Sequence, residues 1–281
     1  MKFKKHRAKS TNMRKLWFLS LITVATLLSW QRADAATVIW VDDNANAYAP
    51  PGKGCTNLAG YATIQAAINA ASPGDTINVC PGSYTENVTI NKAGLTVIST
   101  SGAIATRIVA AAIASVVSIT QPNATVVGFT LVPAGSTAKY DIGVNVAIQG
   151  DTNAEVAHNI IRGGRIGINL GCASSSSTLY HNIVYAASEA GINIDTCEID
   201  PFPGSTFNSV HHNTVCGGIY PYSISGGQGS DFNSIHHNVG KWITVGGDGN
   251  LVHNNTAQLF NVVPGSPPNV TFHNTVAAVY P

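Results

Sequence analysis

Three charged residues recur at a fixed interval and could together meet an ionised ligand. Asp141, Arg165 and Glu189 are 24 residues apart, so a structure that repeats every 24 residues stacks them in one column. Two carboxylates around a guanidinium suit either acid–base chemistry or a plain ion-pair ladder. Asp195 follows Glu189 by six residues, and the candidate catalytic residues are Arg165, Glu189 and Asp195.

Amides and aromatic rings accompany these charges. Alternation that turns Ile168 and Leu170 inward turns Arg165, Gly167 and Asn169 outward. Aligning the later Gly-containing strands with the earlier ones adds aromatic side chains to the same flank, beside the Asn column and Asp195. Sugars bind such surfaces through hydroxyl hydrogen bonds and through ring faces laid on aromatics. The predicted substrate-binding residues are Asn169, Asn193, Tyr220, Tyr222 and Trp242. The alternative is a solvated sheet face with one salt-bridge ladder.

Expected distances argue against glycoside hydrolysis on this flank. That reaction needs two carboxyl groups about 5–5.5 Å or about 6.5–9.5 Å apart. Asp141 and Glu189, two coils apart, would be about 9.6 Å from each other, with Arg165 between them. Glu189 and Asp195 would be roughly 20 Å apart along one strand. The flank is therefore better suited to binding than to catalysis.

Histidine–asparagine words recur through the second half of the chain. They begin at His158, His181, His211, His236, His253 and His273. Asn tolerates the left-handed conformation, and side-chain amides stacked from coil to coil can hydrogen-bond to one another. These words are therefore predicted to be structural turns. Spacing near 24 places one histidine per coil in a line rather than four around a zinc ion. The alternative is a weakly bound ion between histidines of adjacent coils.

The elements that must position these residues are the short strands of a β-solenoid. Gly167-Ile-Asn-Leu and Gly191-Ile-Asn-Ile recur at an interval of 24, and apolar residues alternate with small polar ones. That alternation is the period of strands with one buried face. A mature chain of this length makes roughly eight or nine coils. Within 61–71 the apolar spacing is instead that of a short amphipathic helix, which would cap the first coil.

The segment Tyr61-Ala-Thr-Ile-Gln-Ala-Ala-Ile-Asn-Ala-Ala-Ser-Pro-Gly-Asp-Thr-Ile-Asn-Val, with the following Pro81-Gly-Ser-Tyr-Thr-Glu-Asn-Val-Thr-Ile, resembles the opening of the pectin lyase-like superfamily. The resemblance covers about 38–276 and implies an all-β, right-handed parallel β-helix. The superfamily hosts lyases, hydrolases, esterases, epimerases and binding proteins, so the resemblance specifies the fold rather than an activity.

The motifs of the superfamily's enzymes are incomplete in this chain. Asn193-Ile-Asp195 is similar to the Asn-Thr-Asp motif of polygalacturonases, but the paired aspartates, Gly-His-Gly and Arg-x-Lys that would follow are missing. The paired Gln and Asp signature of pectin methylesterases is missing too. A pectate-lyase mechanism would need Ca²⁺, for which Asp42 and Asp43 are candidate ligands. It would also need a basic residue to abstract a proton, for which Arg162 and Arg165 are candidates, although their surroundings do not match the motif. No other cofactor is expected.

The N-terminus is typical of a secretory signal peptide. Residues 1–35 contain a basic head, an apolar run and Ala33-Asp-Ala35. The alternative is a membrane anchor, but the run is shorter than the roughly 20 residues that span a bilayer. The mature domain, 36–281, would have 7 basic and 13 acidic residues, a net charge of −6. Nucleic acid and anionic membranes are therefore not expected partners.

All five cysteines lie in the part predicted to be exported, where disulfides can form. Cys55 and Cys80 flank the first structured segment, and Cys172 and Cys197 are 25 residues apart. These are the predicted pairs, which leave Cys216 over; buried free thiols are the alternative.

The sequence thus predicts a secreted, periplasmic or surface β-helix protein that binds polysaccharide through an exposed sheet flank. The alternative is a polysaccharide lyase or glycoside hydrolase acting on acidic polysaccharide.

Overall fold

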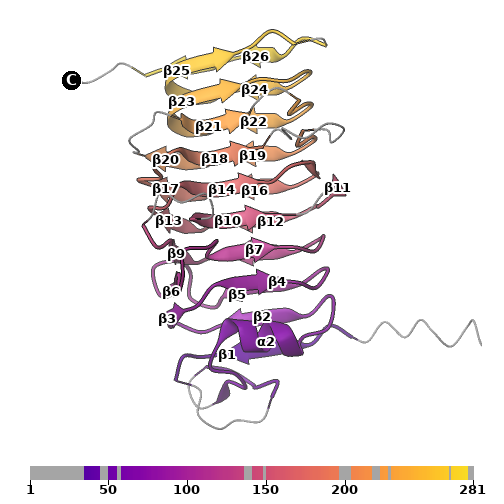
Figure 1. The fold of residues 1–281 in the computed structure, drawn as a ribbon, viewed down its shortest axis with the longest axis vertical. Coiled ribbons are helices and arrows are strands. Elements are labelled where there is room, and N and C mark those ends of the chain that lie inside the picture. Colours follow the sequence, from indigo (N-terminus) through magenta and orange to yellow (C-terminus); the bar gives the residue numbers. More distant parts are fainter. Residues whose placement is uncertain are drawn as a thin grey trace, which may run out of the picture. The chain divides into compact units, whose positions relative to one another are not determined.

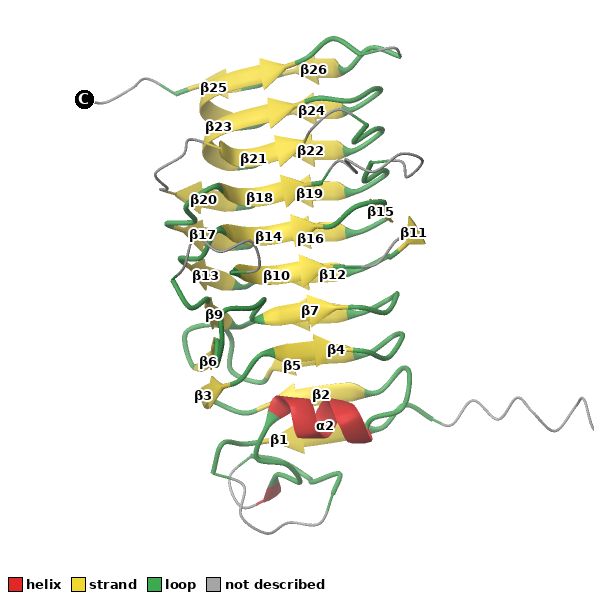
Figure 2. Ribbon diagram, viewed as in Figure 1, coloured by secondary structure: helices red, strands yellow, loops and turns green. Residues whose placement is uncertain are grey.

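Short strands and sharp turns wind the chain into a right-handed parallel β-helix (Figure 1, Figure 2). The computed structural model describes residues 35–44, 50–55, 58–135, 141–147, 150–195, 204–216, 222–226, 229–265 and 267–277, with only the backbone of 150, 151, 222 and 223. The predicted signal peptide lies outside these residues, except for Ala35. No helix in the described part is long and apolar enough to cross a membrane.

The first face of the β-helix is a parallel sheet of ten strands, each paired with the strand of the next coil. The strands, in order along the sheet, are β1 (Val38–Val41), β2 (Thr76–Val79), β5 (Thr96–Ser99), β8 (Thr125–Val127), β12 (Glu155–Ala157), β16 (Thr178–Tyr180), β19 (Ser209–His211), β22 (Ser234–His236), β24 (Leu251–His253) and β26 (Val270–Phe272). Roughly eight or nine coils were expected, whereas the described residues contribute ten strands to this sheet, one from each coil. The number is higher because the later coils shorten to 17 and 19 residues between matching asparagines.

The second and third faces belong to one larger parallel sheet. The second face contains β3 (Gly82–Thr85), β6 (Thr106–Val109), β9 (Thr130–Val132), β13 (Ile160–Arg162), β17 (Ile183–Tyr185) and β20 (Thr214–Cys216). The third face contains β4 (Val88–Ile90), β7 (Val117–Ile119), β10 (Ile142–Val146), β14 (Ile166–Leu170), β18 (Ala190–Ile194) and β21 (Tyr222–Gly226).

The long strand β23 (Val239–Val245) joins the second and third faces, because it pairs with both β20 and β21. Strand β25 (Thr256–Val262) pairs with β23 along its length, and β27 (Thr275–Val276) pairs with β25. A separate pair, β11 (Gly150–Asp151) and β15 (Ser174–Ser175), extends one turn.

Stacked aliphatic side chains fill the interior. From β5 to β24 the second residue of each strand of the first face points inward, and these residues lie directly above one another. That column, no member of it more than 2% exposed, contains Val97, Val126, Val156, Leu179, Val210, Ile235 and Val252. Burying one such side chain stabilises the fold by about 1.5–3 kcal/mol, so the core is a repeated, coil-by-coil contribution.

Asparagines form two ladders at the turns that border the first face, and all of them are buried except the last of each ladder. In each, the backbone N–H and the Nδ2 amide of one Asn donate to Oδ1 of the Asn in the next coil. The longer ladder, with distances of 2.9–3.2 Å, is Asn159, Asn182, Asn213, Asn238, Asn255 and Asn274. The shorter ladder is Asn208, Asn233, Asn250 and Asn269. The predicted stacking of turn amides is confirmed.

The left-handed conformation is taken by the residue before the ladder asparagine, which corrects the expectation that the Asn itself adopts it. Histidine φ angles in this position are between 52° and 56°, at His158, His181, His212, His237 and His273. Asn254 occupies the same position with φ 54°. The turn therefore separates two roles: one residue reverses the chain and the next satisfies the buried backbone.

The predicted cap helix is present as α2 (Ile64–Ala70). The Thr63 side chain accepts a hydrogen bond from Ala66 N, and the Glu86 carboxylate accepts from the N–H groups of Ile64 and Gln65. These bonds satisfy backbone donors that every helix N-terminus leaves free. The apolar stripe of α2 is buried against the first coil.

The Cys55–Cys80 disulfide is present, with an S–S distance of 2.06 Å. Cys172 is also disulfide-bonded; Cys197, its predicted partner, lies outside the described residues. Cys216 is free and exposed, as the pairing predicted.

Candidate functional site

The Arg165–Glu189 pair on the third face is present as an ion pair. Arg165 Nε lies 2.6 Å from Glu189 Oε2, and its Nη2 donates to Oε1 at 2.7 Å. The strand register places Asp141 one coil before Arg165, as predicted. Asp141 is fully buried, and its Oδ1 accepts a hydrogen bond from Ala134 N at 2.8 Å. The forked pair engages both oxygens of Glu189 and favours the salt-bridge interpretation of this column.

The asparagines of the third face also bind one another. Asn169 Nδ2 donates to Asn145 Oδ1 at 2.9 Å, and Asn193 Nδ2 donates to Asn169 Oδ1 at 2.8 Å. Asn169 alternates with the fully buried Ile168 and Leu170, but only 7% of it is exposed, so little of its side chain is accessible to a ligand. Gly167, which was expected to face outward, lies against the core, since a Cβ there would be 2.4 Å from Val184 Cγ1. This column is thus a third amide ladder.

The predicted register of the aromatic residues is wrong. Ile192 pairs with Ile224, which brings Ser225, not Tyr220, beside Asn193. Tyr222 pairs with Ala190 on one side and with Trp242 on the other. The coil that leads to β21 is longer than the alignment of glycines assumed. Tyr220 lies outside the described residues.

The position of Asp195, at the end of β18, is set by its backbone. Its N–H donates to Leu170 O at 2.8 Å, and its carbonyl accepts from Ser205 N at 3.2 Å and from Ser230 Oγ at 3.3 Å. The loop acids Glu198 and Asp200, which could have joined it, lie outside the described residues. A catalytic role for Asp195 remains a prediction.

The second face carries an exposed site that sequence reasoning did not assemble, because Arg162 was considered only as a base for a lyase and Tyr185 was not considered. Arg162, Tyr185 and Cys216 end three successive strands and lie in register. Arg162 is exposed and Tyr185 is 41% exposed. Arg162, Tyr185 and the adjacent Gly163 and Ala186 line a shallow pocket of about 430 Å³. The feature of the sequence that could have revealed this pocket is a cation or an aromatic ring at the third position of a three-residue strand, which faces outward.

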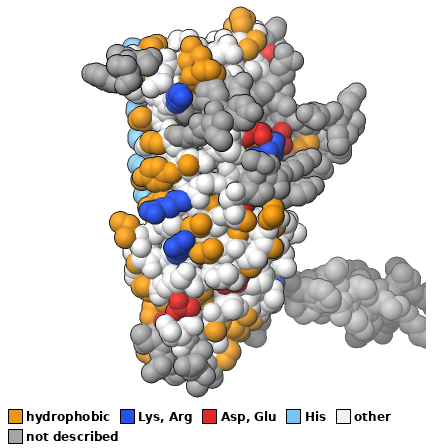
Figure 3. Space-filling model, turned by 60° about the vertical axis from the view of Figure 1, so that its left-hand side comes forward, with side chains coloured by type: hydrophobic (Ala, Val, Ile, Leu, Met, Phe, Trp, Pro, Cys, Tyr) orange, Lys and Arg blue, Asp and Glu red, His pale blue; other side chains and the backbone are white. Residues whose placement is uncertain are grey.

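More basic side chains lie along this face. Arg107 in β6 and Lys241 in β23 are exposed. Figure 3 shows Lys and Arg side chains interspersed with hydrophobic side chains over these strands. The surface therefore combines positive charge with apolar area.

The outer face of the first sheet carries a stack of rings. Centroids lie 4.6–5.3 Å apart and planes are within 10° of parallel along Tyr180, His211, His236, His253 and Phe272. Figure 3 shows the histidines following one edge of the β-helix. Below the stack, a pocket of about 380 Å³ contains Glu155 and Tyr180. The Tyr180 hydroxyl donates to Glu155 Oε1 at 2.6 Å, and this bond to a carboxylate raises the pKa of Tyr180 to about 12.

Acidification is expected to lower the free energy of unfolding of the protein when no metal ion is bound to these histidines. Burial first, and then neighbouring imidazoles, lower the pKa of His236 from 6.5 to about 4; those imidazoles belong to His211, His253, His237 and His212. Below pH 6.5 the unfolded chain binds a proton that the folded chain excludes, so stability is fully present above pH 6.5 and is lost as the pH falls towards 4. Thermal denaturation in EDTA at several pH values in this window checks it. His236→Phe should reduce the slope; a wild-type melting temperature that rises on acidification would contradict the prediction.

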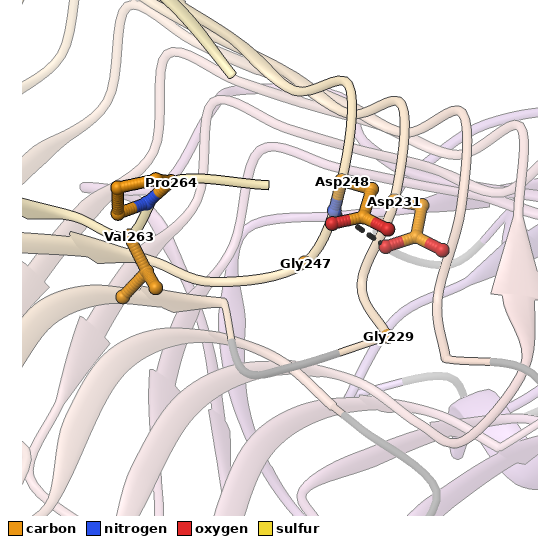
Figure 4. A pocket seen from close by; sticks show the side chains of 6 residues that line it. All are labelled: Gly229, Asp231, Gly247, Asp248, Val263 and Pro264. Atoms are coloured by element: carbon orange, nitrogen blue, oxygen red, sulfur yellow. Dashed lines mark hydrogen bonds between the residues drawn. The ribbon is translucent and has the colours of Figure 1, made fainter. Parts of the chain in front are cut away.

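Acidic side chains elsewhere accept hydrogen bonds from backbone N–H groups. Asp43 Oδ2 accepts from Ser83 N at 2.9 Å, and the buried Asp42 accepts from Asn44 N at 3.0 Å. A Ca²⁺ site at this pair remains a prediction. In another pocket, of about 240 Å³, the Asp231 carboxylate lies beside Asp248 and accepts a hydrogen bond from its backbone N–H at 2.7 Å (Figure 4).

Comparison with known proteins bears on the fold. No family model and no curated protein matches the sequence. Among solved structures, an alginate lyase from Paenibacillus sp. str. FPU-7 is similar, with 15% identity and a TM-score of 0.59 over 79% of this chain and 76% of that chain. Pectate lyase Pel9A is similar with 14% identity and a TM-score of 0.52 over 84% and 73%. These likenesses show the fold alone: the chain is a right-handed parallel β-helix, as those two enzymes are.

Proposed function

We propose that this protein is exported and binds acidic polysaccharide along its second face, around Arg162 and Tyr185. The observation that carries the proposal is the exposed guanidinium of Arg162 next to the exposed ring of Tyr185 in one open pocket. Arginine can bind a carboxylate with two parallel hydrogen bonds. An aromatic ring offers a flat apolar face on which a sugar ring can lie.

The layout of the face suits a polymer rather than a small ligand. Strands of successive coils present their outward side chains at about 4.8 Å intervals, and the pocket is open rather than enclosed. Along the sheet, Arg107 lies two strands before Arg162 and Lys241 lies three strands after it. A polyanion lying across the coils would meet several cations in turn, although the predicted mature chain is acidic as a whole.

The similar solved structures are compatible with this proposal. Their names specify alginate and pectate, both acidic polysaccharides, as the substrates of those enzymes. At 14–15% identity the likeness is one of fold, so the proposal rests on the residues of this chain. The disulfide between Cys55 and Cys80 supports export, because such bonds persist in oxidising compartments.

Arg162→Ala and Tyr185→Ala are each expected to weaken binding of alginate or pectate about tenfold, roughly 1.4 kcal/mol. Affinity electrophoresis in gels containing either polymer, with dextran as the neutral comparison, measures this. Arg165→Ala is the matched control, because it removes the same charge from the third face. Raising the salt concentration should weaken wild-type binding, since the contact is largely ionic.

Two outcomes would overturn the proposal. Retention lost in Arg165→Ala but kept in Arg162→Ala would return the site to the third face. If the wild type is retained by none of the acidic polymers, the proposal that it binds acidic polysaccharide is wrong. The enzymatic alternative is tested on the same substrates: release of reducing ends or unsaturated uronides by the wild type, abolished in Asp195→Asn, would make the protein a hydrolase or lyase.

A further inference from the structure

Two columns of imidazole rings run side by side along one corner of the first face. The strand column contains His211, His236 and His253, stacked at 4.9 Å. The turn column consists of the left-handed residues described above, with ring centroids 4.8–5.1 Å apart along His158, His181, His212 and His237. The rings of His212 and His237 are parallel within 1°, whereas those of His181 and His212 are tilted by 37°. Rings in one column stand nearly perpendicular to the adjacent rings in the other, at 85–88°.

Within a coil, the two columns bring like nitrogen atoms together. Nδ1 of His211 lies 2.9 Å from Nδ1 of His212, and Nδ1 of His236 lies 2.9 Å from Nδ1 of His237. In the absence of a ligand such a pair shares one proton, with one imidazole as donor and the other as acceptor. The same separation fits two neighbouring ligands of one metal ion.

The 2.9 Å separation is closer to the ligand spacing of one metal geometry than to that of another. With metal–nitrogen bonds of about 2.05 Å, two ligands at right angles are about 2.9 Å apart, whereas tetrahedral ligands are about 3.3 Å apart. Right-angled ligands occur in the tetragonal geometry of Cu(II) and Ni(II). Divalent copper is also the strongest binder of imidazole in the first-row series.

A third imidazole completes a cluster. One ring nitrogen from each of His212, His236 and His237 lies within 4.8 Å of the corresponding nitrogens of the other two. His212 and His237 are exposed and His236 is half-buried, so an ion can enter from solvent. The strands of the first face from β16 to β26 contain no Lys or Arg, so no cation on them repels a metal.

The surroundings of the cluster add two further features. The Asn254 Nδ2 atom lies 3.3 Å from His237 Nε2; with the amide flipped, its oxygen can accept a hydrogen bond from Nε2–H once Nδ1 holds a metal. On the next coil, Nδ1 of His253 is buried and has no hydrogen-bond partner among the described residues. Buried polar atoms without a partner are uncommon and mark sites of bound water or ions.

We propose that His212, His236 and His237 form a binding site for a divalent transition-metal ion, with Cu(II) preferred over Zn(II). The backbone holds the three imidazoles in place through the Asn213–Asn238 step of the amide ladder, which directly follows His212 and His237. The site lies on a different face from the proposed polysaccharide surface and is independent of it.

The chain itself supplies matched replacements for the test. Asn occurs naturally in the turn column at Asn254, so His237→Asn preserves the left-handed turn. Phe occurs in the strand column at Phe272, so His236→Phe preserves the ring stack. His158→Asn is the control, because it makes the first of these changes in the same column, two coils away from His212.

The experiment is a titration of the full, tag-free, EDTA-treated chain with CuCl₂, followed by calorimetry and electron paramagnetic resonance. We expect one tightly bound Cu(II) with nitrogen hyperfine structure. Since loss of an outer-shell partner already costs about 10–100-fold, His237→Asn and His236→Phe should each weaken binding on the order of 100-fold. His158→Asn should bind as the wild type does, and Zn(II) should bind more weakly than Cu(II).

Thermal denaturation separates loss of the site from loss of the fold. Copper should raise the melting temperature of the wild type and of His158→Asn, but not that of the two site variants. Equal copper affinity in all four proteins would overturn the proposal. So would a wild type that binds no copper, or a His158→Asn defect as large as that of His237→Asn.

Discussion

Asn213→Leu is expected to lower the free energy of unfolding by about 4 kcal/mol or more, since each buried polar group left without a partner costs about 1–3 kcal/mol. Asn213 Nδ2 donates to Leu179 O at 2.9 Å and to Asn238 Oδ1 at 3.0 Å. Its Oδ1 accepts from both the backbone N–H and the Nδ2 of Asn182. Leucine has a similar size but makes none of these bonds, so buried groups in three coils lose a partner.

Urea denaturation followed by circular dichroism measures the loss of Asn213. Asn69→Leu is the matched control, because Asn69 is an exposed residue of α2 whose side chain accepts one hydrogen bond, from Gln65. That control should change stability by no more than about 0.5 kcal/mol. If the two variants unfold at the same urea concentration, the ladder adds little beyond ordinary turn structure.

Removal of the Cys55–Cys80 disulfide, as Cys55→Ser with Cys80→Ala, is expected to cost about 3.5 kcal/mol. The bridge closes a segment with a sequence separation of 25, and loop-closure entropy for that length gives about this value. The segment includes α2, so amide protection should fall first at Ile64–Ala70. Alanine suits position 80 because Cys80 is fully buried.

Denaturation of the disulfide variant and of a Cys216→Ala control under non-reducing conditions tests this expectation. Cys216 is free and exposed, so its replacement should be nearly neutral, within about 0.5 kcal/mol. Unchanged stability in the double variant, with unchanged amide exchange in α2, would show that packing of the helix on the first coil is sufficient to hold the cap.

The parts of the fold that depend on local pattern were predictable from the sequence. The recurrence of Gly143-Val-Asn in β10 and of Gly-Ile-Asn in β14 and β18 predicted the register of these strands, because the coils have equal lengths. The spacing of Ile64, Ala67 and Ile68 gave the buried side of the cap helix. The Asn stacking followed from the recurrence of the turn words.

The candidate site was less predictable, for two physical reasons. Coils vary in length, from 17 residues between matching asparagines to 31, so an alignment carried over one long loop shifted Tyr222 by several positions. Arg162 and Tyr185 lie in strands of three residues, too short for alternation to stand out from the sequence. Their alignment depends on pairing between β13 and β17, which is a property of the assembled coil.

The unequal coils have an evolutionary consequence. Matching turn residues stay in register whether 17 or 31 residues separate them, because each ladder fixes only one asparagine per coil. A loop can therefore lengthen, shorten or change its chemistry on one coil while the coils on either side keep their contacts. Each coil can therefore carry a loop that varies independently of the others, and new recognition surfaces can arise by local insertion while the core stays unchanged.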